Sequence, residues 1–140
     1  MYRMLLVEDD PRDAALMIEA LRECRIETDL QVVQDGSKAL EMLQCNTASD
    51  SGWRPDLVVC DLHGAGISGH DLLRIMKSDA LFRKIPVVIM SASSAPIVVN
   101  LSYELQANCY IQKPSSFNDL CAVVRSLYDF WFSTVVLPQR

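Results

Sequence analysis

Residues 4–10 read Met-Leu-Leu-Val-Glu-Asp-Asp, an uninterrupted apolar run that ends in three acids. Residues 57–61, Leu-Val-Val-Cys-Asp, repeat this arrangement, and residues 85–91, Ile-Pro-Val-Val-Ile-Met-Ser, end in a hydroxyl instead. Strands that are apolar throughout, rather than alternating, are buried on both faces, which is typical of a parallel sheet with helices on either side. These runs therefore decide the fold class.

Outward from these runs, extended and helical segments alternate along the chain. We expect strands at residues 4–7, 30–33, 57–60, 85–90 and 109–111. Apolar residues at helical spacing predict helices at residues 14–24, 38–45, 72–80, 97–106 and 117–132. The polar residues 46–55 are expected to form a loop. The order βαβαβαβαβα predicts an α/β fold with a doubly wound, five-stranded parallel sheet and five helices.

Composition limits the classes of function. The 140 residues are 50% hydrophobic and 22% charged, which fits one globular domain. The net charge of −5, with no basic run, argues against nucleic-acid binding and against an anionic membrane surface. No apolar run approaches the ~20 residues that span a bilayer, and acids follow the first run too soon for a signal peptide. We therefore expect a cytoplasmic protein.

Cysteine usage agrees with a reducing compartment. The chain has five cysteines, an odd number, and no two are close enough in sequence to form a CxxC pair. The two histidines, His63 and His70, are not near a cysteine pair, so a structural zinc site is not expected. We predict free thiols.

Residues with chemical capacity follow four of the expected strands. Glu8 and Asp9 follow the first strand, Asp61 the third, Ser91 the fourth, and Lys113 the fifth. In a doubly wound sheet, ligands bind beyond the carboxyl ends of the strands. Carboxylates gathered there repel one another unless a cation lies between them, and hard oxygen ligands suit Mg²⁺. The sequence therefore predicts a magnesium site with a lysine beside it.

The roles of these acids differ. Acids after a strand are often only helix caps, and Asp10-Pro11 has the form of an N-cap followed by proline at the first helical position. Glu8 and Asp9 are therefore the better metal ligands. Asp61 stands alone on the central strand, which favours it as a nucleophile that forms an acyl phosphate. Lys113 would neutralise charge on the transferred group.

Taken together in order, Glu8-Asp9, Asp61, Ser91-Ala92 and Lys113-Pro114 resemble the receiver domain of two-component response regulators. The resemblance covers residues 3 to about 130 and implies a flavodoxin-like sheet with strand order 2-1-3-4-5. It leaves residues 131–140 as a short apolar extension with no output domain.

The resemblance also implies roles for single residues. Asp61 matches the phosphoacceptor, and Glu8 and Asp9 match the acidic pair that holds Mg²⁺ together with Asp61 and the backbone carbonyl of His63. Ser91 and Tyr110 match the switch residues. Lys113 matches the lysine of the site, and its bond to Pro114 matches a position that is typically cis.

One departure from the family pattern lies in the loop after Asp61, and two variable positions of the family are occupied by His63 and Ser93. Gly64 and Ala65 stand where many receivers have an apolar residue and a proline, so a softer loop is expected. His63 and Ser93 occupy positions that tune loss of the phosphoryl group in this family. The His63 side chain is either a catalytic base or, as we favour, an exposed group next to a carbonyl ligand.

A finer resemblance is to stand-alone regulators that partner phytochrome-type histidine kinases. It rests on residues 108–114, on the long loop at residues 46–55, and on the ending Phe-Trp-Phe … Val-Val-Leu-Pro. It implies a histidine kinase as partner and often a homodimer through the C-terminal end. Residues expected in that dimer are Phe130, Trp131, Phe132, Val135, Val136 and Leu137. The alternative is that this tail wraps over its own sheet edge.

The kinase must approach Asp61 in line, across the rim formed by the first helix and the loop after the last strand. Expected contacts are Arg12, Asp13, Leu16, Met17, Pro114 and Ser115.

A chain that only accepts a phosphoryl group is not an enzyme, so no enzymatic activity is expected. Two other functions compete with this interpretation. A phosphatase of the haloacid-dehalogenase type needs a second acid two residues after the nucleophile, where this chain has His63. The other alternative is a pseudo-receiver that binds a partner without phosphorylation. Such a protein does not need all of the site residues, so their presence here argues against it.

Overall fold

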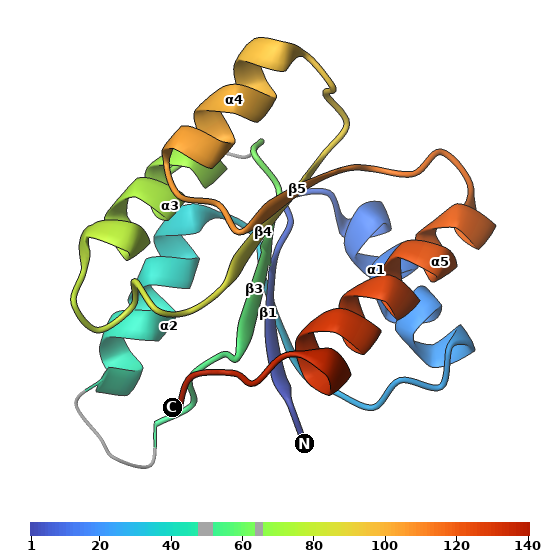
Figure 1. Ribbon diagram of the computed structural model, residues 1–140, viewed down its shortest axis with the longest axis horizontal. Helices are drawn as coiled ribbons and strands as arrows, with labels where there is room; N and C mark the ends of the chain where they lie inside the picture. Colours follow the sequence, from blue (N-terminus) through green and yellow to red (C-terminus); the bar gives the residue numbers. More distant parts are fainter. Residues whose placement is uncertain (48–51, 64–65) are drawn as a thin grey trace.

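The structure is a computed structural model that describes residues 1–47, 52–63 and 66–140. Five parallel strands form one sheet, as the apolar runs predict, in the order β2-β1-β3-β4-β5 (Figure 1) that the resemblance to receiver domains implies. The strands are β1 (Arg3–Val7), β2 (Asp29–Val33), β3 (Leu57–Cys60), β4 (Val87–Ser91) and β5 (Cys109–Gln112). The helices are α1 (Pro11–Glu23), α2 (Gly36–Thr47), α3 (Gly69–Ser78), α4 (Pro96–Glu104) and α5 (Phe117–Tyr128), followed by η1 (Asp129–Thr134).

Burial follows strand position. Every residue of the central strands β3 and β4 is buried, and so are the last four residues of β1. Neither edge strand, β2 or β5, contains a buried residue. The sequence of β2 is less apolar than the sequences of β1, β3 and β4, because an edge strand has fewer side chains buried between layers.

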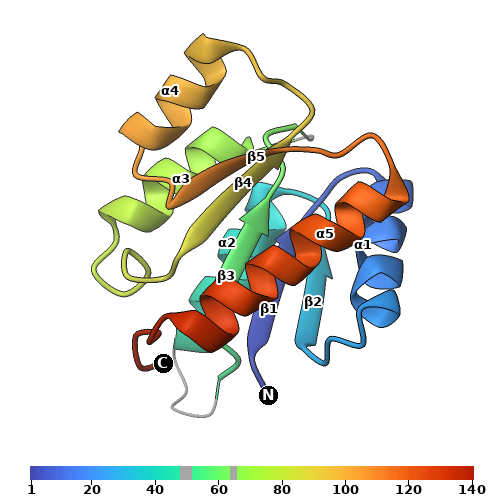
Figure 2. The ribbon, with the colours of Figure 1, turned by 45° about the vertical axis from the view of Figure 1, so that its right-hand side comes forward.

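Helices cover both faces of the sheet. Helices α1 and α5 lie side by side on one face, while α2, α3 and α4 lie on the other (Figures 1 and 2). Alternate residues of each central strand serve the two cores: Leu5 and Val7 pack toward α2 and α3, whereas Met4 and Leu6 pack toward α1 and α5. This is the doubly wound arrangement expected from strands that are apolar on both sides.

Helix starts follow the capping rules. Asp10 is the N-cap of α1 and its Oδ1 accepts the Arg12 backbone N–H at 2.8 Å, with Pro11 in the first turn. The side chains of Ser68 and Ser116 cap α3 and α5 in the same way. The cap predicted at Asp10 is confirmed, and it starts α1 three residues before the first apolar residue of the pattern.

The C-terminal segment differs from the single helix expected at residues 117–132. Helix α5 ends at Tyr128, and a π-helical turn follows, in which the Val135 N–H donates to the Phe130 carbonyl at 3.0 Å. The wider turn brings the Phe132 ring onto Tyr2, with ring centroids 4.6 Å apart. Phe132 is buried in the core beneath α5, so its expected place in a dimer interface is wrong.

The rest of the tail returns to the edge where β1 begins, and both termini lie there (Figure 1). The Arg140 guanidinium donates to both carboxylate oxygens of Asp56, at 3.1 and 2.8 Å, and to the Met1 carbonyl at 3.2 Å. Trp53 folds back onto the domain and donates its indole N–H to Asp29 at 2.7 Å. Within the described ranges, no helix has the length and apolar character needed to cross a bilayer.

The burial of Phe132 is tested by comparing it with its neighbour Phe130, half of whose surface is exposed. Phe132→Ala should lower the free energy of unfolding by about 3 kcal/mol or more, because it removes a buried ring and leaves a cavity. Phe130→Ala should cost less than about 1 kcal/mol. Urea unfolding of both variants measures the difference, and equal losses would contradict the placement of Phe132 in the core.

Candidate functional site

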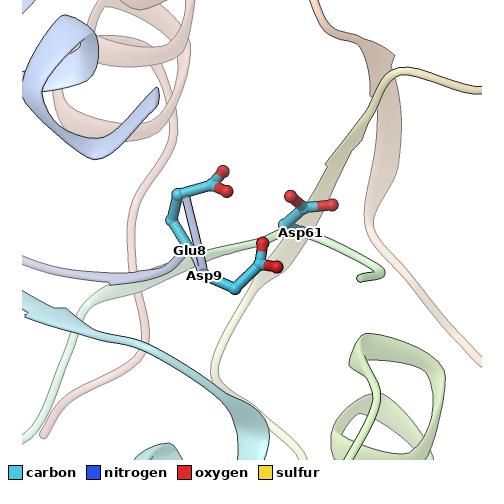
Figure 3. Close-up of side chains that lie close together, drawn as sticks. All are labelled: Glu8, Asp9 and Asp61. Atoms are coloured by element: carbon cyan, nitrogen blue, oxygen red, sulfur yellow. The ribbon is translucent and has the colours of Figure 1, made fainter. Parts of the chain in front are cut away.

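The three acids predicted to form the site meet at the carboxyl edge of the sheet. Val7 at the end of β1 pairs with Cys60 at the end of β3, so the residues that follow them leave the sheet side by side. Ligand oxygens of Glu8, Asp9 and Asp61 all lie within 4.8 Å of one another (Figure 3). Glu8 and Asp61 are buried, whereas Asp9 is exposed.

Lys113 reaches this cluster from the end of β5. Its backbone N–H donates to the Ser91 carbonyl at 2.7 Å, which sets its position relative to β4. Its Nζ lies 2.8 Å from Asp61 Oδ2, 2.9 Å from Glu8 Oε2 and 2.8 Å from Asp13 Oδ2. One half-buried ammonium therefore contacts three carboxylates and offsets part of their negative charge.

The charges in this cluster are unequally distributed. Burial raises the pKa of Glu8 to about 7, although hydrogen bonds from Lys113 and the Asp10 N–H oppose the shift. Burial acts on Asp61 in the same direction, but hydrogen bonds with Lys113, Glu8 and the His63 N–H outweigh it and hold the pKa of Asp61 below its usual value. Asp61 is therefore the carboxylate that stays ionised, as a nucleophile must be.

The pKa of Lys113 responds to the same contacts. Burial lowers it, but hydrogen bonds with Asp13, Asp61 and Glu8 raise it more, so the net shift is upward. The ammonium remains charged beside Asp61 throughout the physiological pH range.

The donor set fits a hard divalent cation. Three carboxylates from two adjacent strand ends provide oxygen ligands, and the exposure of Asp9 leaves room for the waters that Mg²⁺ retains. The His63 backbone N–H donates to Asp61 Oδ1 at 3.2 Å, while the His63 side chain is exposed. The use of the His63 carbonyl as a ligand stays a prediction.

The two expected switch residues are joined through Ser93. Ser91 is fully buried, and its hydroxyl accepts the Ser93 backbone N–H at 3.3 Å. The Tyr110 hydroxyl donates to the Ser93 carbonyl at 2.7 Å. The segment between β4 and α4 is therefore held by the Ser91 hydroxyl and by the Tyr110 side chain of β5.

Two expectations need correction. Met17 is only 4% exposed because it lies on the face of α1 that packs against the sheet, so it is not a kinase contact. The bond between Lys113 and Pro114 is trans, not cis, which is the form that most X–Pro bonds adopt. The soft loop expected at Gly64 and Ala65 lies outside the described residues.

Asp13 has a role in the site that the sequence reasoning did not assign. It was expected only as a kinase contact, but it is also a direct partner of Lys113. The available signal was its position three residues after the N-cap Asp10, in the first turn of a helix that begins at the edge of the site. The bridging role of Ser93 is of a different kind, since it uses backbone atoms and has no sequence signal.

The remaining rim residues lie where a partner can reach them. Arg12 and Leu16 on α1, and Ser115 after β5, are exposed, and Pro114 is half-buried. Leu16, Asp13 and Pro114 also line a small pocket next to Lys113 and Asp61. Exposed residues therefore border the cluster on this side.

Removal of Lys113 should expose the repulsion between the buried acids. In EDTA at pH 8, Lys113→Met should lower the free energy of unfolding by about 3 kcal/mol, because Glu8 and Asp61 lose their counter-charge. Added Mg²⁺ should restore part of this loss and raise the thermal midpoint of the variant more than that of the unaltered protein.

Lys38→Met, which removes an exposed lysine on α2, is the matched control and should change the free energy of unfolding by less than about 0.5 kcal/mol. Differential scanning calorimetry compares the variants. A Lys113→Met midpoint that is unchanged in EDTA would show that Lys113 is not the ion that balances the cluster.

Comparison with known proteins agrees with this geometry. Residues 4–125 match the response regulator receiver domain family. The response regulator Rcp1 of Synechocystis sp. is 35% identical over 135 residues, which cover 96% of this chain and 92% of Rcp1. The crystal structure of its Mn²⁺-bound form aligns with a TM-score of 0.87 over 99% of this chain and all of that one, at 34% identity.

The phosphorylated cyanobacterial phytochrome response regulator RcpA aligns with a TM-score of 0.89 at 34% identity and covers 99% of each chain. RPA3017 of R. palustris, a response regulator in red light signalling, aligns over the whole of both chains with a TM-score of 0.91 at 27% identity. The shared fold, the strand-end acids and the lysine beside them lead to one conclusion: this chain belongs to the receiver domain family of response regulators.

Proposed function

We propose that this chain is a cytoplasmic, stand-alone response regulator that accepts a phosphoryl group from a histidine kinase onto Asp61. The observation that carries the proposal is the ion pair of 2.8 Å between Lys113 and a buried Asp61 that lies in a cluster with Glu8 and Asp9. The receiver domain relatives are signalling proteins, and we place this chain among them rather than among the enzymes.

The transfer uses groups of this chain in defined roles. The ionised Asp61 carboxylate attacks the phosphorus of a phosphohistidine, so that a P–O bond forms as the P–N bond breaks and the imidazole nitrogen takes a proton. Lys113 balances the charge of the incoming group. The Ser91 hydroxyl donates a hydrogen bond to a phosphoryl oxygen.

A Mg²⁺ ion fits the acidic cluster, with Glu8, Asp9, Asp61 and the His63 carbonyl as its protein ligands. When bound, it would neutralise negative charge on the phosphoryl oxygens. The acidic composition of the cluster supports this proposal, as does the Mn²⁺ bound to Rcp1.

Phosphorylation would act on the rest of the domain through Ser93. A Ser91 hydroxyl that turns toward a phosphoryl oxygen no longer accepts the Ser93 N–H, and the carbonyl of the same Ser93 holds the Tyr110 hydroxyl. The segment before α4 and the Tyr110 side chain would therefore move together.

We propose a phytochrome-type histidine kinase as the partner. The support is similarity to regulators whose names carry that association, the cyanobacterial phytochrome response regulator RcpA and the bacteriophytochrome response regulator RtBRR. The kinase would dock on the exposed rim formed by Arg12, Leu16, Pro114 and Ser115, with Asp13 held by Lys113.

We also propose a homodimer through the C-terminal segment. Without Phe132, the remaining candidates fall into two groups. Val136 and Phe130 are 98% and 50% exposed, whereas Trp131, Val135 and Leu137 are half-buried. An apolar groove between β5 and α5 continues this surface and includes Ile111, Val123 and Trp131. Two copies related by a twofold axis would cover both surfaces.

Asp61→Asn should abolish labelling by acetyl phosphate in the presence of Mg²⁺, because an amide is not a nucleophile for phosphorus. The substitution is isosteric, so the circular dichroism spectrum and cooperative unfolding should persist. Phosphoprotein gels or intact mass measure the labelling. A fully labelled Asp61→Asn variant would refute the assignment, and an unlabelled wild-type protein would favour the pseudo-receiver.

Arg12→Glu should slow transfer from a cognate histidine kinase by tenfold or more while leaving labelling by acetyl phosphate unchanged. The reason is that the Arg12 side chain is 90% exposed on the rim but does not contact Asp61. Arg22→Glu is the matched control, since Arg22 is exposed at the opposite end of the same helix. Equal slowing with both donors would mean that the substitution damages the site itself.

Val136→Asp combined with Phe130→Ser should convert a dimer into a monomer at micromolar concentration, because charge and lost apolar area weaken the shared surface. Leu81→Ser, which alters an exposed leucine after α3, should leave the assembly intact. Light scattering on each protein decides, and a wild-type chain that runs as a monomer would contradict the proposed dimer.

A further inference from the structure

Two cysteines that are 97 residues apart in sequence meet where α1 and α5 lie side by side (Figure 2). Cys24 is the C-cap of α1, and Cys121 lies in the second turn of α5. The Cys24 Sγ lies 3.5 Å from the backbone carbonyl oxygen of Cys121. The two thiol side chains also share a hydrogen bond, which places one sulfur close to the other.

A third residue, Arg125, holds α1 and α5 in position relative to each other. Arg125, one turn after Cys121 on α5, donates a hydrogen bond from its guanidinium to the Cys24 carbonyl at 3.1 Å. The same guanidinium therefore holds the end of α1 against the turn of α5 that carries Cys121. Neither element can shift along the other without breaking this bond.

The pair differs from the other three thiols of the chain. Cys60 is fully buried, and burial, followed by the charges of Asp61 and Glu8, raises its pKa, so it is inert. Cys45 is exposed on α2, on the opposite face of the sheet, and Cys109 lies in β5. Cys24 and Cys121 are partly exposed, as Cys109 is, so a small oxidant can reach them. What sets Cys24 and Cys121 apart is their contact with each other.

The two thiols also interact electrostatically. Partial desolvation, together with the neighbouring Cys24 thiol and Glu23, raises the pKa of Cys121, and Arg125 opposes this shift. Cys121 is therefore mostly a neutral thiol at neutral pH, so its attack on an oxidised Cys24 proceeds through the thiolate and should become faster as the pH rises.

We propose that Cys24 and Cys121 are a redox modification site that forms a reversible disulfide between α1 and α5. Hydrogen peroxide oxidises Cys24 to a sulfenic acid and releases one water, and the Cys121 sulfur then displaces the sulfenic oxygen as a second water. Each sulfur gives up one electron, the peroxide takes up both, and both thiol protons leave in the water formed. A low-molecular-weight thiol reverses the bond by exchange.

The bond would fasten α1 at the end that lies away from the site. The N-terminal end of α1 is already held by Asp13, whose carboxylate contacts Lys113 at 2.8 Å. The disulfide closes a long loop, so it restricts the unfolded chain strongly and should raise thermal stability. The cross-link does not touch Asp61, so it should leave phosphorylation by a small donor unchanged.

The test treats the reduced full-length protein with hydrogen peroxide and counts free thiols with a chromogenic disulfide. We expect two thiols to be lost per chain, the thermal midpoint to rise by about 5 °C or more, and dithiothreitol to reverse both changes. Peptide mapping after combined trypsin and chymotrypsin digestion should show Cys24 linked to Cys121, because cleavage after Tyr110 separates Cys109 from Cys121.

Four variants complete the test. Cys24→Ser and Cys121→Ser should each lose the cross-link and the stabilisation, whereas Cys45→Ser and Cys109→Ser should keep both. A linked peptide that contains any other cysteine would overturn the proposal. So would a bond between two chains, or Cys24 oxidised without a cross-link.

Discussion

The Lys113 ammonium is the charge on which the arrangement of this site depends. Glu8 and Asp61 are buried side by side because they follow adjacent parallel strands whose register is fixed, and two buried carboxylates repel each other. Lys113 offsets that repulsion by contacting both of them and also Asp13. Lys113 lies at the end of β5, and its backbone N–H bonds to Ser91 of β4. The site therefore depends on the ends of four strands, β1, β3, β4 and β5.

The same network gives the two buried acids different characters. Asp61 receives hydrogen bonds from Lys113 and the His63 backbone and stays ionised, whereas burial raises the pKa of Glu8 to about 7. Two similar side chains in adjacent positions thus differ in how readily they ionise, and the ionised one is the proposed nucleophile, Asp61. The difference comes from hydrogen-bond partners rather than from residue type, so it depends on the folded structure.

Helix α1 connects three features of the molecule. Its first turn supplies Asp13 to Lys113, its exposed N-terminal rim is the proposed kinase surface, and its C-cap places Cys24 against α5. A cross-link at the far end would not alter the reacting groups, but it would restrain the helix that carries the docking surface. The proposed phosphorylation chemistry and the proposed thiol chemistry therefore lie at opposite ends of α1.

The sequence alone determined the doubly wound parallel fold class, the helix cap at Asp10 and the cluster of Glu8, Asp9, Asp61 and Lys113. Apolar runs and strand-end residues encode these features locally, and the carboxyl ends of parallel strands share one edge. Only the tertiary structure decided that Phe132 and Met17 are buried, that Asp13 contacts Lys113, and that Cys24 meets Cys121. Each of these depends on the rotation of a helix or turn about its axis and on its distance from a remote segment. Side-chain packing between elements sets both quantities, and no local pattern records them.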